Sequence, residues 1–362
     1  MAAPGHYGFG SVYSFSEAKV AARLMVRLSP PCDVIRFDQD GRAAEGFHAV
    51  IAGFGETGTA VLEQLVMNGQ FCGGDFSVDV FDPSPKNGML FGSELMERYT
   101  IRFHEYSAGS REFFTFLKEN RCNYIVLSTG DEKGNFYLDS TLRKWFSQER
   151  TVCPEIVLCT RKGVLKTVSG ADTACYRDIY NSDALELEKM DRVAMQINQY
   201  YQGNGKTPAE NWKDCDFFSR LSCRAAADFY PAVLRAAGMT EQQVLDGKWS
   251  VSPQVLENLA VTEHLRWCAF HSAMGYRPMD ERTFEERSRA YLDEKHQKGS
   301  SSVKVAKDTE NRLHACLILW EQLDALSEKV NAVTGGHTDY KQADRDNILA
   351  VPDVIRAARG NN

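Results

Sequence analysis

The first half of the chain alternates between short apolar runs and amphipathic stretches. Strand-like apolar runs occur at 47–53, 76–82, 99–105, 123–129 and 155–160. Helical stretches separate them, at 57–69, 88–97, 110–120 and 135–149. Nearly continuous apolar strands separated by helices are typical of a parallel sheet that is covered on both faces. The pattern therefore predicts a doubly wound α/β domain of the Rossmann type over residues 47–170.

The chain on either side of this domain has helical periodicity. Residues 14–28 combine an apolar face with a capping-box pattern, Ser14 with Glu17, so we expect a helix within an N-terminal extension, 1–46. After Gly170 we expect no further strand. A connecting segment, 171–210, is predicted to hold a helix at 183–201 and a linker at 203–208.

Residues 211–362 are predicted to form a mainly α-helical domain. Its helices are expected at 214–237, 253–274, 281–297 and 343–358. Residues 298–311 contain a glycine, three serines and mixed charges, which indicates a mobile loop.

Composition narrows the class of protein. The chain has 362 residues with 43% hydrophobic and 25% charged positions, which is ordinary for a soluble globular protein. Its net charge of -7 argues against nucleic acid as a partner. The ten cysteines form no C-x-x-C pair, so we expect no metal site. No apolar run reaches the ~18 residues of a bilayer span, and no secretory signal opens the sequence, so we expect a cytoplasmic protein without a membrane segment.

The strongest chemical signal is a glycine turn after the first predicted strand. It has the pattern G-x-G-x-x-G and consists of Gly53, Phe54, Gly55, Glu56, Thr57 and Gly58. In such a turn the first glycine permits the bend, the second lets a pyrophosphate approach, and the third lets the helix pack close to the sheet. The helix N-terminus then attracts the phosphate. The turn predicts a nucleotide site, and the alternative is that the glycines only permit tight packing.

Two carboxylates bear on the choice of nucleotide. The second predicted strand ends in Asp82, 24 residues after Gly58. A carboxylate there accepts hydrogen bonds from ribose hydroxyls and repels a 2′-phosphate, which favours NAD or an adenine nucleotide over NADP. Glu56 lies inside the turn, where it weakens anion binding, faces solvent or helps to hold a metal.

Polar residues also follow the fourth predicted strand. They are Thr129, Gly130 and Asp131, with Asn135 at the start of the next helix. Ligands of open α/β sheets lie at the carboxyl ends of the strands, near the point where strand order reverses. We therefore expect these residues to line the same crevice as the glycine turn. For Asp131 and Asn135 a plain polar loop is the alternative.

Residues 48–163 resemble the regulatory nucleotide-binding domains of the Trk potassium-uptake family, which are known as TrkA-N-like domains. The resemblance rests on the glycine turn, the acid after the second strand and the turn after the fourth strand. It implies that NAD or an adenine nucleotide binds at these three places. Glu56 departs from the family's pattern.

A second group of motifs lies between 212 and 356. It comprises E-H-x-R-W within 259–267, Gly275-Tyr276-Arg277, His314–Leu317 with Trp320, and Asp344 before the last helix. This group resembles the ryanodine-receptor repeat (RyR) domain, whose bacterial members often follow a nucleotide-binding domain. The resemblance implies a module that binds a ligand or a partner. Ala315, where proline is usual, and a longer insert at 279–311 depart from the family's pattern.

Helical spacing places His264, Trp267 and His271 on one face, where they offer a stacking platform for a base or a small polar ligand. Arg266 and Arg277 are candidates for a phosphate contact. The alternative is a folding core in which Trp267 packs on Trp320, and in which His264 and His314 bond to Glu263 or Asp344. The candidate ligand-binding residues are Glu263, His264, Arg266, Trp267, Tyr276, Arg277, His314, Trp320 and Asp344.

These features favour a nucleotide-binding sensor or regulatory protein, with a second ligand or a protein partner at the RyR-like region. The first alternative is an NAD-dependent oxidoreductase. No tyrosine near the predicted strands is followed by a lysine four residues later, and no P-loop, G-x-S-x-G or H-E-x-x-H motif is present. The second alternative is the cytosolic regulatory part of a channel or a defence effector. A homodimer is a further hypothesis.

Overall fold

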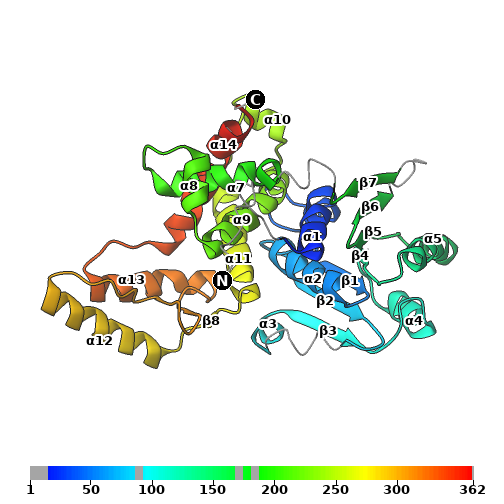
Figure 1. The fold of residues 1–362 in the computed structure, drawn as a ribbon, viewed down its shortest axis with the longest axis horizontal. Helices are drawn as coiled ribbons and strands as arrows, with labels where there is room; N and C mark the ends of the chain where they lie inside the picture. The colour runs from blue at the N-terminus through cyan, green and yellow to red at the C-terminus, as the bar shows by residue number, and fades with distance from the viewer. Residues whose placement is uncertain (1–14, 86–92, 168–173, 181–186, 361–362) are drawn as a thin grey trace, which may run out of the picture.

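The main sheet of the protein is mostly parallel. In the computed structural model, which describes residues 15–85, 93–167, 174–180 and 187–360, this sheet has seven strands. The parallel strands are β1 (Phe47–Ala52), β2 (Phe76–Phe81), β3 (Thr100–His104), β4 (Tyr124–Leu127) and β5 (Glu155–Thr160). The antiparallel strands are β6 (Gly163–Thr167) and β7 (Ala174–Asp178). Their order is β3-β2-β1-β4-β5-β6-β7 (Figure 1), so a Rossmann-like α/β fold is confirmed.

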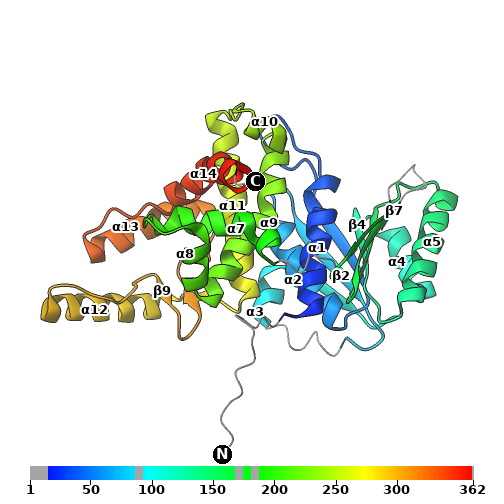
Figure 2. The ribbon, with the colours of Figure 1, turned by 45° about the horizontal axis from the view of Figure 1, so that its top comes forward.

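Helices cover both faces of this sheet. α4 (Arg111–Glu119) and α5 (Glu132–Glu149) lie on one face, and α1 (Glu17–Leu28) and α2 (Glu56–Asn68) lie on the other (Figure 2). Because successive side chains of a strand point to opposite faces, Val50 and Ala52 join the core under α4 and α5, whereas Ala49 and Ile51 join the core under α1 and α2.

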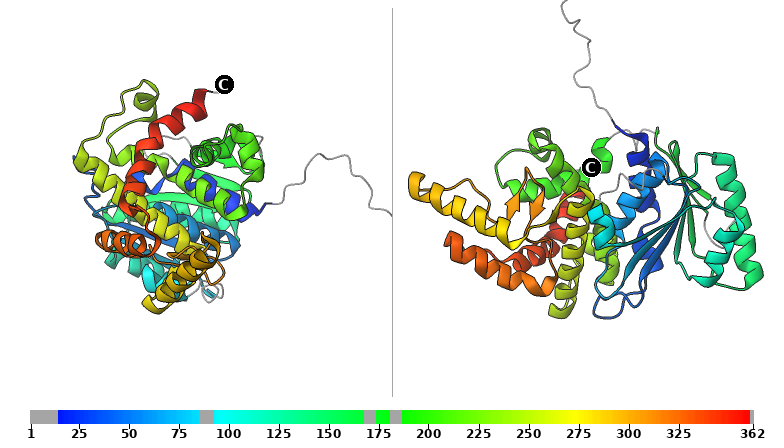
Figure 3. Two further views of the ribbon diagram at one scale, coloured as in Figure 1. Left: turned by 90° about the vertical axis from the view of Figure 1, so that its left-hand side faces the viewer. Right: turned by 90° about the horizontal axis from the view of Figure 1, so that it is seen from below.

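The C-terminal helices pack on the outer side of α2. The same hydrophobic cluster contains Leu62 of α2, Phe229 of α9 (Phe217–Ala236) and Leu259 of α11 (Pro253–Ala273). Helix α2 is therefore covered from both sides, and nine of its thirteen residues are buried. The layers run from α4 and α5 through the sheet and α1 and α2 to the C-terminal helices (Figure 3). The domain boundaries after residues 46, 170 and 210 stay predictions.

The expectation that strands stop after Gly170 is wrong. β7 follows it, and a small sheet of β8 (Arg277–Pro278), β10 (Leu313–His314) and β9 (Lys307–Asp308) lies among the C-terminal helices. Strands this short show no clear alternation of apolar and polar residues in the sequence. Pairing with a neighbouring strand determines where they form. The mobile loop predicted for 298–311 is wrong for its second half, since β9 pairs with β10 and Val305 and Ala306 are buried.

Several helix bounds also differ from the prediction. The predicted helix 14–28 begins at Glu17 with Ser16, not Ser14, as its N-cap; Ser14 lies outside the described residues. The predicted linker 203–208 runs into α8 (Pro208–Asp214), which a capping box between Thr207 and Glu210 starts. A new cap at Asp216 separates α8 from α9, so the helix predicted for 214–237 is confirmed as α9 but begins three residues later. Parts of the predicted helices 88–97 and 183–201 lie outside the described residues; their described parts are α3 (Ser93–Arg98) and α7 (Leu187–Gln202).

The remaining elements complete the C-terminal half. They are α10 (Glu241–Leu245), α12 (Glu281–Lys298), α13 (Leu323–Thr334) and α14 (Tyr340–Gly360), together with the 3-10 turn η3 (Trp320–Gln322). A further 3-10 turn, η1 (Pro31–Val34), follows α1. The pattern analysis missed α10 and α13. In the described part of the chain, no helix combines the length and the apolar character that crossing a membrane requires.

A buried ion network joins α1 to the helices of the second half. Arg23 donates from Nε and Nη2 to the two carboxylate oxygens of Asp228 at 2.7 and 3.1 Å, and from Nη1 to Asp191 at 3.0 Å. Arg224 donates to the other oxygen of Asp191 at 2.9 Å. Because both aspartates are fully enclosed, these bonds act in a medium of low polarity and fix α1 against α7 and α9.

Candidate functional site

The glycine turn lies at the carboxyl edge of the sheet, beside the point where strand order reverses between β1 and β4. Gly53 has a φ of +97°, in the left-handed region that glycine adopts without strain. A Cβ on Gly53 would lie 2.6 Å from the Thr129 nitrogen, and one on Gly58 would lie 2.1 Å from the Gly53 carbonyl oxygen. The first and third glycines are therefore explained by the packing of the turn.

Gly55 differs from these two. Its φ of -77° is open to any residue, and it is the N-cap of α2. No heavy atom of the described residues comes within 4 Å of the position that its Cβ would occupy. Packing therefore does not require glycine here, and the missing side chain leaves the N-terminus of α2 open to a ligand.

A cavity of about 400 Å³ adjoins Gly55. It brings together the ends of β1, β4 and β5, and its lining includes Gly55, Glu56, Thr57, Thr129 and Gly130 from the sequence prediction, together with Ser128, Glu132, Thr160 and Arg161. The predicted residues Gly53 and Gly58 form the turn behind it. The glycine turn and the loop after β4 therefore line the same cavity, as the strand order predicts.

Asp82 lies at the edge of the turn, as its spacing predicts. Its Oδ2 accepts the N–H of Phe54 at 2.8 Å, and its Oδ1 accepts the N–H of Ser84 at 2.8 Å. Phe54 is buried with its ring 5.1 Å from that of Phe103. Two backbone amides therefore hold the carboxylate beside the turn, although Asp82 is not among the residues that line the cavity.

Asn135 does not line the cavity, because it is fully buried beneath the loop after β4. Thr129 donates from Oγ1 to Asn135 Oδ1 at 2.5 Å, and Asn135 Nδ2 donates to the Thr129 carbonyl oxygen at 3.1 Å. Asp131 is the N-cap residue of α5 and is exposed. Asn135 therefore holds the shape of the loop, which presents Thr129 and Gly130 to the cavity.

Arg161 is the residue that the sequence analysis missed. It follows β5 directly and forms an ion pair with Glu56 across the cavity lining. Both side chains are largely exposed, at 60% and 70%. The sequence feature that indicates Arg161 is its position at the carboxyl end of a predicted parallel strand, because ligands of such sheets lie at that edge. A phosphate that enters the cavity would compete with Glu56 for this guanidinium.

We expect Glu56→Gln to strengthen nucleotide binding. The substitution removes the carboxylate that competes with phosphate for Arg161 and keeps the size of the side chain. An exposed ion pair contributes up to ~1 kcal/mol, so the affinity should rise about fivefold. Calorimetry with NAD measures this, and Arg161→Ala should change the affinity in the opposite direction. A weaker affinity of Glu56→Gln would mean that Glu56 itself contacts the ligand.

A second cavity, of about 340 Å³, lies among the C-terminal helices. Six of the nine residues predicted for the RyR-like region line it: Glu263, His264, Arg266, Trp267, His314 and Asp344. Arg266 forms a two-point ion pair with Glu263 at 2.8 and 2.7 Å. The other three candidates lie elsewhere, because Tyr276 faces another cleft, Arg277 borders a separate surface hollow, and Trp320 is buried with its Nε1 donating to Glu257 at 3.2 Å.

His264 carries a proton on both ring nitrogens in this geometry. Its Nδ1 lies 3.3 Å from Asp344 Oδ2 and its Nε2 lies 3.0 Å from the Ile318 carbonyl oxygen, and both partners only accept. Burial alone would lower the pKa of His264, but Asp344, then Cys268 and the Ile318 carbonyl oxygen, raise it to about 10. Trp267 and Trp320 belong to one hydrophobic cluster, and the ring of His264 lies 6.3 Å from the first and 5.8 Å from the second.

One donor in the wall of this second cavity is unsatisfied. Arg266 is 2% exposed, and its Nη1 has no hydrogen-bond partner among the described residues. A buried N–H without an acceptor costs about 1–3 kcal/mol, which a bound ligand or water would recover.

The ring of Trp267 lies 3.8 Å from that of His271, so these residues share a face as the spacing predicts.

Comparison of the chain with protein-family models, with curated proteins and with solved structures gave no match. The resemblances to the Trk-type and RyR domains therefore stay predictions, and the geometry of the two cavities carries the functional argument.

Proposed function

We propose that this chain is a cytoplasmic nucleotide-binding regulatory protein that holds NAD or an adenine nucleotide at its glycine turn. One observation carries the proposal: Gly55 has no steric reason to be glycine, yet it opens the first turn of α2 toward a cavity. The backbone amides at that helix start are suited to a diphosphate. The Asp82 carboxylate beside the turn favours an unmodified ribose over a 2′-phosphate.

The cavity around Arg266 supports a second ligand in the C-terminal half. Its wall contains the unpaired donor Arg266 Nη1 and the indole ring of Trp267. It also contains two ion pairs, Glu263–Arg266 and His264–Asp344. Since the pairs Glu263–Arg266 and His264–Asp344 are each neutral, a small polar ligand without net charge suits this cavity best. Two ligand sites on helices that pack against each other are typical of a sensor.

Direct binding tests the proposal. Native mass spectrometry of freshly purified protein should reveal a co-purified nucleotide, and calorimetry should show binding of NAD or ADP. Protein that binds none of NAD, ADP, ATP and AMP at millimolar concentration would overturn it. Incubation with NADH and a panel of carbonyl compounds should leave the absorbance at 340 nm unchanged, since turnover would favour an oxidoreductase instead.

We expect Asp82→Ala to reduce the preference for NAD over NADP about tenfold. The substitution removes the charge that repels a 2′-phosphate, a difference of ~1.4 kcal/mol. Asp82→Asn is the matched variant, because its amide oxygen still accepts from Phe54 while the charge is lost. The dissociation constants of both dinucleotides measure the preference. If it stays the same in both variants, Asp82 does not contact the ribose.

A further inference from the structure

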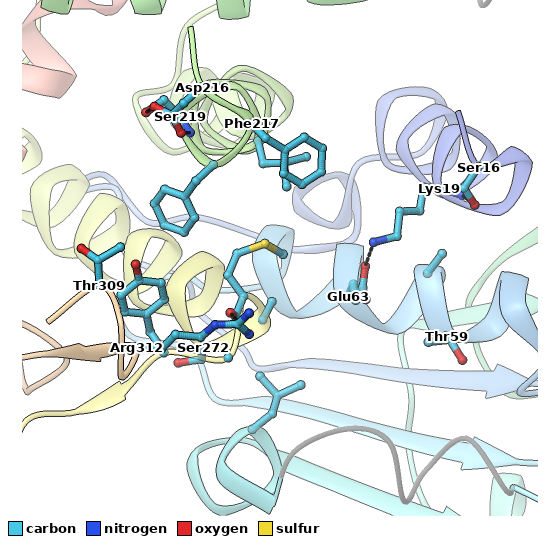
Figure 4. A pocket seen from close by; sticks show the side chains of 18 of the residues that line it. Ser16, Lys19, Thr59, Glu63, Asp216, Phe217, Ser219, Ser272, Thr309 and Arg312 are labelled. Atoms are coloured by element: carbon cyan, nitrogen blue, oxygen red, sulfur yellow. Dashed lines mark hydrogen bonds and ion pairs between the residues drawn. The ribbon is translucent and has the colours of Figure 1, made fainter. Parts of the chain in front are cut away.

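A cleft of about 1340 Å³ opens beside the packed helices, between the first turns of α1 and α2, the start of α9 and the segment 304–312. Figure 4 shows Lys19 and Glu63 of α1 and α2 on one side, and Arg312 with Thr309 on the opposite side. The start of α9, with Asp216 and Phe217, forms a third wall. Glu56 lines both this cleft and the cavity at the glycine turn, so the two spaces are neighbours.

The negative charges of the cleft are already engaged. Glu63 forms an ion pair with Lys19 at 3.6 Å, and Glu56 forms one with Arg161. Asp216 accepts hydrogen bonds from the backbone nitrogen and the hydroxyl of Ser219 at 3.0 and 2.6 Å. Glu63 and Glu56 are therefore each paired with a cation, whereas Asp216 is held by hydrogen bonds alone and its charge acts to raise the pKa of Lys307, which burial lowers.

Three cations on the opposite wall are not compensated. Lys304, Lys307 and Arg312 line the cleft, and none of them has a carboxylate within ion-pair distance in the described part of the chain. The neighbouring Asp308 pairs instead with Arg287 at 3.3 Å. The positive charge of this wall thus faces the cleft.

Aromatic rings hold Lys307 in place. Its Nζ lies 4.9 Å from the ring centre of Phe218 and 5.3 Å from that of Tyr276. Burial and the nearby Lys304 lower the pKa of Lys307, and an anion bound beside it would reverse that shift. Phe217, by contrast, has 74% of its surface exposed at the mouth of the cleft, which leaves a ring free for a planar group.

The segment that bears these cations is rigid. Val305 and Ala306 are buried, and Asp308 accepts the backbone N–H groups of Glu310 and Asn311 at 3.1 Å. Arg312 has a φ of +53°, an uncommon conformation for a residue with a side chain and one that occurs preferentially at functional sites. Because this backbone is anchored, binding an anion there costs less ordering entropy than binding to a mobile loop.

We propose that this cleft binds a phosphorylated small molecule with a planar ring, with its phosphates against Lys304, Lys307 and Arg312 and its ring against Phe217. The site is distinct from the glycine turn and goes beyond the nucleotide-binding function proposed above. The cations of one wall recognise the phosphates, and the ring of Phe217 on the other wall stacks on the planar ring.

The experiment separates this site from the glycine turn by using the Gly55→Asp variant throughout. Two probes are compared by calorimetry in about 50 mM salt, where screening is weak: inorganic tripolyphosphate, which has no ring, and ATP. Both should bind, and ATP should bind more tightly. Combining Lys304→Ala, Lys307→Ala and Arg312→Asn should weaken both at least tenfold; asparagine is chosen because it tolerates a positive φ.

The matched control removes three cations from the far side of the molecule, with Lys118→Ala, Lys133→Ala and Lys144→Ala on α4 and α5. This control should leave both affinities within twofold. Phe217→Ala should weaken ATP but not tripolyphosphate. Lys304→Glu, at an exposed position, repeats the test should the triple variant not fold. The proposal is overturned if neither probe binds, if the control loses as much as the triple variant, or if Phe217→Ala leaves ATP binding unchanged.

Discussion

Gly55→Asp should abolish nucleotide binding at the glycine turn while the protein stays folded. The position has an ordinary φ of -77°, and no heavy atom of the described residues lies within 4 Å of the added Cβ. The new carboxylate would project into the space that a diphosphate needs and would repel it. We expect the affinity to fall at least 100-fold, ~2.7 kcal/mol.

Calorimetry with NAD, together with thermal melting of the same samples, measures this result. Gly205→Asp is the control, since that glycine also has open space around its Cβ position but lies far along the chain in the segment before α8. Gly58→Ala should behave in the opposite way and destabilise the fold, because its Cβ would lie 2.1 Å from a carbonyl oxygen. An unchanged affinity in folded Gly55→Asp would remove the proposed site.

Asp228→Ala should destabilise the whole protein by about 3–5 kcal/mol, the usual cost of breaking a buried ion pair. Asp228 accepts two bonds from Arg23 and a third, at 3.2 Å, from the partly exposed Arg27, so its loss leaves the enclosed guanidinium of Arg23 with fewer acceptors. Since these arginines belong to α1 and Asp228 belongs to α9, the contact between the two halves of the chain weakens first.

Urea unfolding monitored by circular dichroism gives the free energy of unfolding of Asp228→Ala. Asp353→Ala is the control, because Asp353 has 77% of its side chain exposed and pairs with Arg356 on the same helix. Its loss should change stability by less than ~0.5 kcal/mol. A change below 1 kcal/mol for Asp228→Ala would show that the network does not hold the halves together.

The parallel strands and the meeting of the glycine turn with the loop after β4 were predictable from local patterns. Each parallel strand lies within two residues of an apolar run, and the spacing of Asp82 after the turn placed its carboxylate beside Phe54. Asn135 shows the limit of this reasoning: its position at the start of a helix predicted a ligand contact, whereas its amide holds the loop from below. Position along a strand or helix indicates the neighbourhood of a side chain, but its partners decide its role.

The sequence by itself determined the parallel strands, the long helices and the glycine turn, because period, capping and the need for a missing side chain act over a few residues. The tertiary structure alone decided that Arg161 faces Glu56, that Arg23 reaches Asp228, and that uncompensated cations face α2 across a cleft. These contacts join residues that are far apart along the chain. They depend on how the layers stack and on which side chains the stacking leaves without partners, and no local spacing encodes either.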